Sequence, residues 1–146
     1  MTCWGTIAAA CHRNRPVVID TSALIALLTG EPSAPRLIAA LERDPVRLVS
    51  AATVLEATLV LLGRYGDGGD APLDRLLRAM DAEIVPVTSL HLSIARDAAL
   101  HFRRGKHSAA LNFGDLFSYA LAISIGEPLL FVGADFTATD VLTVAW

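Results

Sequence analysis

The sequence predicts a single α/β domain with a central, mainly parallel sheet between two layers of helices. Three observations carry this prediction. The chain has 146 residues, which is the size of one domain. Segments of strand and helix character alternate along it, as they do in sheets whose parallel strands are connected by helices. The expected strands are continuously apolar, which is typical of strands that are buried on both faces.

The first elements follow from local signals. Residues 17–19 are β-branched and predict a buried strand that ends at Asp20. Thr21 and Ser22 can cap a helix that stops before Gly30. The next expected elements are a helix at 33–43, a strand at 47–50 and a long helix at 51–65.

The second half repeats this alternation. Glycines and aspartates make 66–70 the clearest loop, and 105–113 is expected to be another. The remaining expected helices are 72–82, 89–104 and 114–125, and the remaining strands are 83–87, 129–132 and 141–144. Residues 1–15 show no clear period and are expected to form a poorly ordered tail, so the domain would span 16–146.

Composition restricts the class of protein. The chain is 53% hydrophobic, with a mean hydropathy of +0.50, so we expect an apolar face that a partner covers. It has no run of the roughly 18–20 uncharged apolar residues that a membrane span requires. A net charge of −3 counts weakly against nucleic-acid binding. Two cysteines, Cys3 and Cys11, form no disulfide framework, and the cytoplasm is the expected compartment.

Four acidic residues are expected at the carboxyl edge of the sheet, where ligands bind to open parallel sheets. Asp20 ends the first strand and Asp135 follows the strand 129–132, whereas Asp115 and Glu56 lie near the starts of helices. Three of them also have structural interpretations. Asp20 can be a helix N-cap, Asp115 can interact with a helix dipole, and Asp135 can be a turn residue.

Glu56 is harder to explain structurally, because it is the only charge in the apolar stretch 51–62. A buried unpaired carboxylate is costly, so Glu56 needs an arginine, a metal ion or an opening to solvent. Carboxylates gathered at one edge repel each other unless a cation neutralises them. Mg²⁺ or Mn²⁺ suits such oxygen ligands and activates water against phosphate esters. This chemistry alone does not identify RNA as the substrate.

Four segments of the chain resemble motifs of PIN-domain nucleases, and specifically of VapC-type toxins from VapBC toxin–antitoxin pairs. They are residues 17–24, 48–56, 111–122 and 126–140. The resemblance implies a PIN-like three-layer fold and an Mg²⁺- or Mn²⁺-dependent endoribonuclease that cleaves tRNA or rRNA. It also implies a VapB-type antitoxin as partner and a homodimer.

The resemblance also implies roles for individual residues. The four acids would be catalytic and bind metal, with Asp20 and Asp115 as principal ligands and Glu56 and Asp135 in support. Thr21 or Ser22 would orient a phosphate or a water, unless they only cap the helix. Arg104 and Lys106 would hold RNA phosphate, unless they only form a solvated helix end.

One departure from the family leaves an alternative open. Many relatives carry two adjacent aspartates where this chain has Ala134 and Asp135, so Asp135 or Asp140 would have to supply the fourth carboxylate. A catalytically silent PIN module that binds RNA or a protein is therefore the alternative function.

Two other folds with acidic sites fit less well. A haloacid-dehalogenase-like phosphatase needs a second aspartate where Ser22 stands. A response-regulator receiver needs a lysine after a late strand. The only lysine here, Lys106, is instead expected in the loop 105–113, before a helix. His91, His101 and His107 are expected on the surface and not as general bases.

Overall fold

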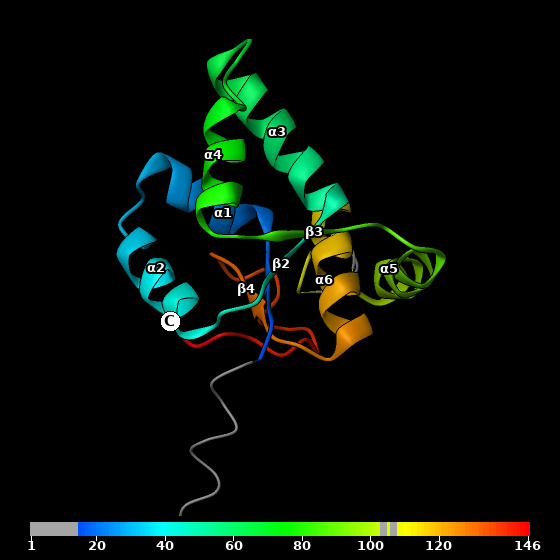
Figure 1. The fold of residues 1–146 in the computed structure, drawn as a ribbon. Coiled ribbons are helices and arrows are strands. Elements are labelled where there is room, and N and C mark those ends of the chain that lie inside the picture. Colours follow the sequence, from blue (N-terminus) through cyan, green and yellow to red (C-terminus); the bar gives the residue numbers. More distant parts are fainter. Residues whose placement is uncertain (1–14, 103–104, 106–107) are drawn as a thin grey trace, which may run out of the picture.

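The computed structural model describes residues 15–102, 105 and 108–146, and it confirms the α/β fold (Figure 1). In this part of the chain the sheet has four parallel strands in the order β3-β2-β1-β4. The strands are β1 (Val17–Ile19), β2 (Arg47–Ser50), β3 (Glu83–Val85) and β4 (Leu129–Leu130). The helices are α1 (Thr21–Thr29), α2 (Ala34–Arg43), α3 (Ala51–Tyr65), α4 (Ala71–Ala79), α5 (Ser89–Phe102) and α6 (Phe113–Ile125).

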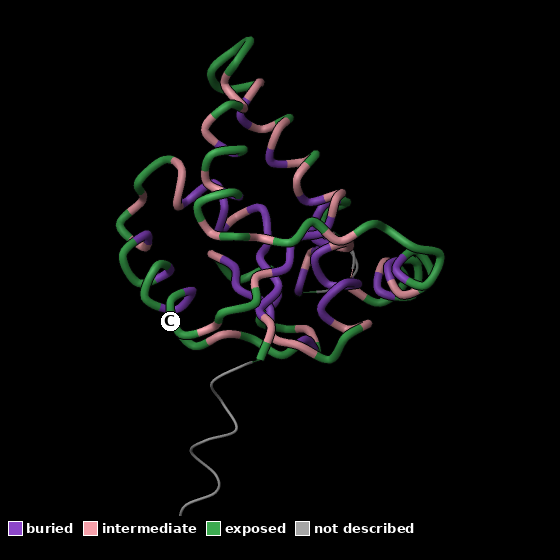
Figure 2. The backbone as a smooth tube through the Cα atoms, in the orientation of Figure 1, coloured by how far each residue is buried: buried purple, intermediate pink, exposed green. Residues whose placement is uncertain are grey.

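The central strand β1 separates two hydrophobic clusters. Val17 and Ile19 belong to a cluster with buried residues of α1, α2, α3 and α4. Val18 points to the opposite face and packs with residues of α5 and α6. Alternate residues of a strand face opposite sides of a sheet, so helices cover both faces of β1. Figure 2 shows the buried residues concentrated around the strands, between these helical layers.

The edge strand β3 departs from the prediction of continuous burial. Glu83 and Ile84 are exposed, and the strand ends at Val85 instead of residue 87. Pro86 follows directly and has no backbone N–H to donate to a ladder. Apolar character alone therefore overestimated both the burial and the length of this strand.

The end of the sheet also differs from the prediction. β4 stops at Leu130, because the next backbone groups bond to side chains: the Trp146 indole donates to the Phe131 carbonyl, and the Val132 N–H donates to the Ser22 hydroxyl. The predicted strand 141–144 is reduced to an isolated parallel bridge between Leu129 and Thr143. The prediction of a last strand was therefore wrong, although this segment does lie beside β4.

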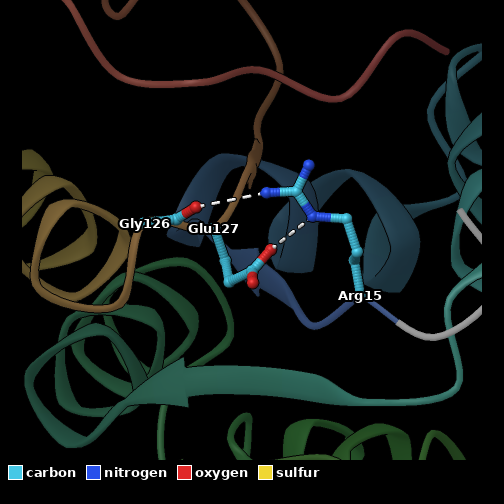
Figure 3. A network of polar contacts seen from close by, with 3 residues as sticks. All are labelled: Arg15, Gly126 and Glu127. Carbon is cyan, nitrogen blue, oxygen red and sulfur yellow. Dashed lines mark hydrogen bonds and ion pairs between the residues drawn. The ribbon is translucent and has the colours of Figure 1, made fainter. Parts of the chain in front are cut away.

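The described chain begins at Arg15, which is fastened to the turn before β4 (Figure 3). Its Nε donates to Oε2 of Glu127 at 3.1 Å, and its Nη2 donates to the Gly126 carbonyl at 3.4 Å. The rest of the predicted tail, residues 1–14, lies outside the described residues, so the tail and the domain boundary stay predictions.

The strand order places a binding edge beside β1. The chain runs from β1 outward to β2 and β3, then returns to place β4 on the other side of β1. Such a reversal leaves a crevice at the carboxyl ends of the strands on either side of it. Asp20 directly follows β1 there. None of the helices in the described residues is long and apolar enough to cross a membrane.

Candidate active site

The four predicted acids line one cavity of about 290 Å³ at the carboxyl edge of the sheet. They come from four places: the end of β1, the second turn of α3, the first turn of α6 and the turn after β4. They are, in chain order, Asp20, Glu56, Asp115 and Asp135. Glu31 and Arg64 also line this cavity. Among the lining residues that the structure describes, five carboxylates therefore face a single cationic side chain.

Asp20 is held by one of its two carboxylate oxygens. Oδ2 accepts from the Ser22 backbone N–H at 3.0 Å and from the Ser22 hydroxyl at 2.7 Å. Asp20 itself is therefore the N-cap of α1, one of the two interpretations that the sequence left open for it, and Thr21 and Ser22 are not. The other oxygen, Oδ1, is buried and has no hydrogen-bond partner among the described residues. A buried carboxylate oxygen without a partner is costly, so this atom is suited to bind a cation.

Ser22 links Asp20 to the neighbouring strand segment. Its hydroxyl donates to Asp20 Oδ2 and accepts from the Val132 backbone N–H at 3.0 Å. The hydroxyl proton and one of the two oxygen lone pairs are thus used within the protein. Ser22 therefore supports Asp20, and its implied contact with phosphate or water stays a prediction.

Glu56 is half-buried, and its partner is Thr21. The Thr21 hydroxyl donates to Glu56 Oε2 at 2.5 Å, which connects the start of α1 to α3. Thr21 therefore also serves a carboxylate of the site. Burial raises the pKa of Glu56; the Thr21 hydrogen bond opposes this shift, and the charge of Asp20 adds to it.

Asp115 is buried in the first turn of α6, where Asn112 holds it. Asp115 Oδ2 accepts from the Asn112 N–H at 2.9 Å, and Asn112 Oδ1 accepts from the Asp115 N–H at 3.0 Å. These reciprocal bonds form a capping box. The pKa of Asp115 is raised to about 7. Burial is the largest cause, the Asn112 bond opposes it, and the charges of Asp20, Asp135 and Glu56 add to it.

The fourth acid of the cavity is Asp135. Of the residues that the structure describes, Asp135 lines the acidic cavity and Asp140 does not. Asp140 Oδ1 instead accepts from the Tyr119 hydroxyl at 2.6 Å. Asp135, next to Ala134 in the sequence, is therefore the acid that this segment contributes to the cavity. It is near enough for its charge to raise the pKa of Asp115.

The donor set fits a divalent cation. Asp20 Oδ1 is unpartnered within the described chain, and the carboxylates around it raise the pKa of Asp115 by repulsion. As placed, no three acidic, histidine or cysteine side chains in the described residues converge closely enough to form a complete ligand set. Mg²⁺ does not require one, because it keeps several waters and binds through one or two carboxylates together with substrate phosphate.

Some predicted positions fall elsewhere. Arg104 and Lys106, the expected phosphate contacts, lie outside the described residues, as does His107. His101 is exposed, as expected. His91 is buried, so the prediction of a surface residue was wrong: its Nδ1 accepts from the Thr88 N–H, and its Nε2 contacts the Ser124 hydroxyl at 3.1 Å.

Three polar residues that line this cavity were not predicted: Glu31, Arg64 and Asn112. Asn112 was detectable, because an N-cap residue three positions before an acid is the spacing of a capping box. Glu31 and Arg64 carry no comparable signal, since each lies at the end of its segment without a motif. They reach the cavity only through the packing of α1 and α3.

Replacing Asn112 with Ala should lower the free energy of unfolding by about 1 kcal/mol, which is typical for loss of an N-cap. Chemical denaturation measures this change. The matched control is Ser33→Ala at the N-cap of α2, because Ser33 makes no side-chain cap bond within the described chain. Its buried hydroxyl also lacks a partner there, so its removal should cost almost nothing. Equal destabilisation by both changes would contradict a structural role for the Asn112 cap.

Comparison with known proteins connects this geometry to a family. The family model described as PIN domain matches residues 17–142. Ribonuclease VapC30 of Mycobacterium tuberculosis is 47% identical over 129 residues, which cover 88% of this chain and 98% of that protein.

Solved structures share the fold. The structure of Mycobacterium tuberculosis VapC20, described as a sarcin–ricin-loop-cleaving toxin, has a TM-score of 0.71 at 22% identity and covers 88% of this chain and 98% of its own. Rickettsia felis VapBC2, solved with a DNA fragment from its promoter, has a TM-score of 0.69 at 13% identity, with 89% and 97% covered.

Proposed function

Because this chain belongs to the PIN-domain family and, within it, to the VapC ribonucleases, we propose that it is the toxin of a type II toxin–antitoxin pair. In this proposal it is an Mg²⁺- or Mn²⁺-dependent endoribonuclease that cleaves tRNA or rRNA in the cytoplasm. The observation that carries the proposal is the buried, unpartnered Oδ1 of Asp20 in a cavity with three further predicted acids, within the described chain.

In this proposal the residues of the cavity have different roles in hydrolysis. Asp20 and Asp115 would be the principal ligands of the divalent ion, with Asp135 in support. When bound, this ion would lower the pKa of water and neutralise charge on the phosphodiester. Thr21 holds Oε2 of Glu56, so Oε1 is the oxygen that can orient the attacking water and accept its proton. A pKa raised by burial makes Glu56 a better base than an exposed glutamate.

Partners would bind to surfaces that the domain leaves apolar. Leu55 and Leu59 on α3 are 59% and 61% exposed, and Phe113 at the start of α6 is 78% exposed. Isolated apolar residues on a surface are ordinary, but three large ones on two packed helices favour an interface. A second copy of the chain and a VapB-type antitoxin are the partners that we propose.

The test is incubation of total RNA with purified protein, in Mg²⁺ and in EDTA. Wild type should release discrete fragments in Mg²⁺ and none in EDTA, and the fragment ends would identify the target. Asp115→Asn, purified in the same way, should release none. The protein must be free of antitoxin and shown to be folded. Intact RNA under these conditions would contradict the nuclease and indicate the silent RNA- or protein-binding module.

A further inference from the structure

Gly114 lies in the first turn of α6, between Phe113 and the acidic Asp115, and it is buried. Its backbone does not explain why glycine stands there, because Gly114 is not among the described residues with a positive φ. Within a helix, glycine is less favourable than alanine. Some other feature of the structure must therefore account for the missing side chain.

That feature is the carboxylate of Glu56. A Cβ atom added to Gly114 would lie 2.0 Å from Cδ, Oε1 and Oε2 of Glu56. All three distances are far below van der Waals contact, so this carboxylate occupies the space that a side chain at 114 would fill. From the other side, the Thr21 hydroxyl donates to Oε2 at 2.5 Å. The Glu56 carboxylate thus lies between the Thr21 hydroxyl of α1 and the backbone of α6 at Gly114.

We propose that Gly114 is a positioning residue, whose lack of a side chain creates the seat in which Thr21 holds the Glu56 carboxylate at the acidic cavity. The geometric part of this inference stands on the contacts alone. Its consequence for catalysis rests on the proposed function. Gly114 acts through Glu56 and contacts no substrate itself.

A side chain at position 114 should displace the Glu56 carboxylate and leave the fold intact. The clashing atoms are the far end of a flexible side chain, which is only half-buried and lines an open cavity. Rotation of Glu56 away from α6 therefore relieves the clash more easily than movement of the helix. The alanine also improves the helix propensity of α6. Gly114→Ala should consequently unfold at the same temperature as wild type or higher.

The chain contains a matched control. Gly63 is also a helical glycine without positive φ, in α3, and an added Cβ there would meet no described atom within 4 Å. Gly63→Ala therefore repeats the chemical change without filling a seat. Its RNA cleavage and its metal binding should equal those of wild type.

The experiment compares wild type with Gly114→Ala, Gly63→Ala, Glu56→Ala and the double variant Glu56→Ala/Gly114→Ala. RNA cleavage, Mg²⁺ binding by calorimetry, thermal unfolding and a crystal structure of Gly114→Ala are the measurements. Gly114→Ala should cleave RNA about 10- to 100-fold more slowly, which is typical for loss of a group that orients a site residue. The double variant should be no slower than Glu56→Ala, because the carboxylate that the added methyl group at position 114 would displace is already absent.

The crystal structure decides the geometric claim even if wild type proves to lack nuclease activity. A Glu56 carboxylate that has left the Thr21 hydroxyl supports the seat, and one that remains bonded to it overturns the inference. Full cleavage by Gly114→Ala, or strictly additive losses in the double variant, overturns the consequence for catalysis. If Gly114→Ala does not fold, recovery of folding in the double variant supports the seat, and failure of both variants overturns it.

Discussion

Replacing Asp20 with Asn is expected to reduce RNA cleavage by roughly a thousandfold or more, because it removes the anionic oxygen that would bind the metal ion. The change should leave the fold intact. Asparagine caps helices as well as aspartate does, and its carbonyl oxygen can still accept from Ser22 as Oδ2 now does. The cleavage rate and thermal unfolding of the purified variant measure the two effects separately.

Asp140→Asn is the matched control for this change. Asp140 bonds to Tyr119 and does not line the acidic cavity of the described chain, so the same substitution there should leave cleavage unchanged. Asp115→Asn should behave as Asp20→Asn does. Retained cleavage by both cavity variants would contradict the assignment of these acids as metal ligands.

The second large effect is a dependence of metal affinity on pH. Burial raises the pKa of Asp115 to about 7 in the metal-free protein, and a metal ligand must be deprotonated. The dissociation constant for Mg²⁺ should therefore fall by about tenfold for each pH unit between about 5 and 7, then level off. Calorimetric titrations at several pH values measure this. An affinity that does not change across this range would contradict the raised pKa.

The same shift predicts how stability without metal varies with pH. The pKa of folded Asp115 lies above its unfolded value of 3.8, so the folded state binds more protons between about pH 4 and pH 7. The free energy of unfolding should therefore fall as pH rises through this range. Asp115→Asn should flatten this slope and be more stable than wild type at pH 8 in EDTA, whereas Asp140→Asn should retain it. Saturating Mg²⁺ should restore the stability of wild type at pH 8.

Local and periodic signals predicted the architecture of this protein well. Asp20 and Asp135 could be placed because residues that follow parallel strands meet at one edge of the sheet. Asp115 and Glu56 were placed by the same reasoning, applied to helices that begin near that edge. The β-branched run of β1 and the break at Gly30 also have local causes that a sequence displays directly.

What could not be predicted depends on contacts between distant segments. β4 ends early because the backbone that follows it bonds to side chains. The Val132 N–H bonds to Ser22, 110 residues away, and the Phe131 carbonyl bonds to Trp146, 15 residues away. The sequence offered Thr21 either as a contact to phosphate or water or as a helix cap, and it gave no signal for the bond from its hydroxyl to a carboxylate 35 residues away. Gly114 has no signal of its own, because its role is to leave space for another residue. Such features exist only after the helices have packed.

The bond from Val132 to the Ser22 hydroxyl has a consequence for the timing of activity during protein synthesis. Ser22, which supports Asp20, is translated 110 residues before Val132, whose backbone N–H donates to its hydroxyl. A nascent chain that carries Asp20, Glu56 and Asp115 but ends before Val132 lacks both this support and Asp135. The complete acidic cavity can therefore form only after residues 132 and 135 have been translated.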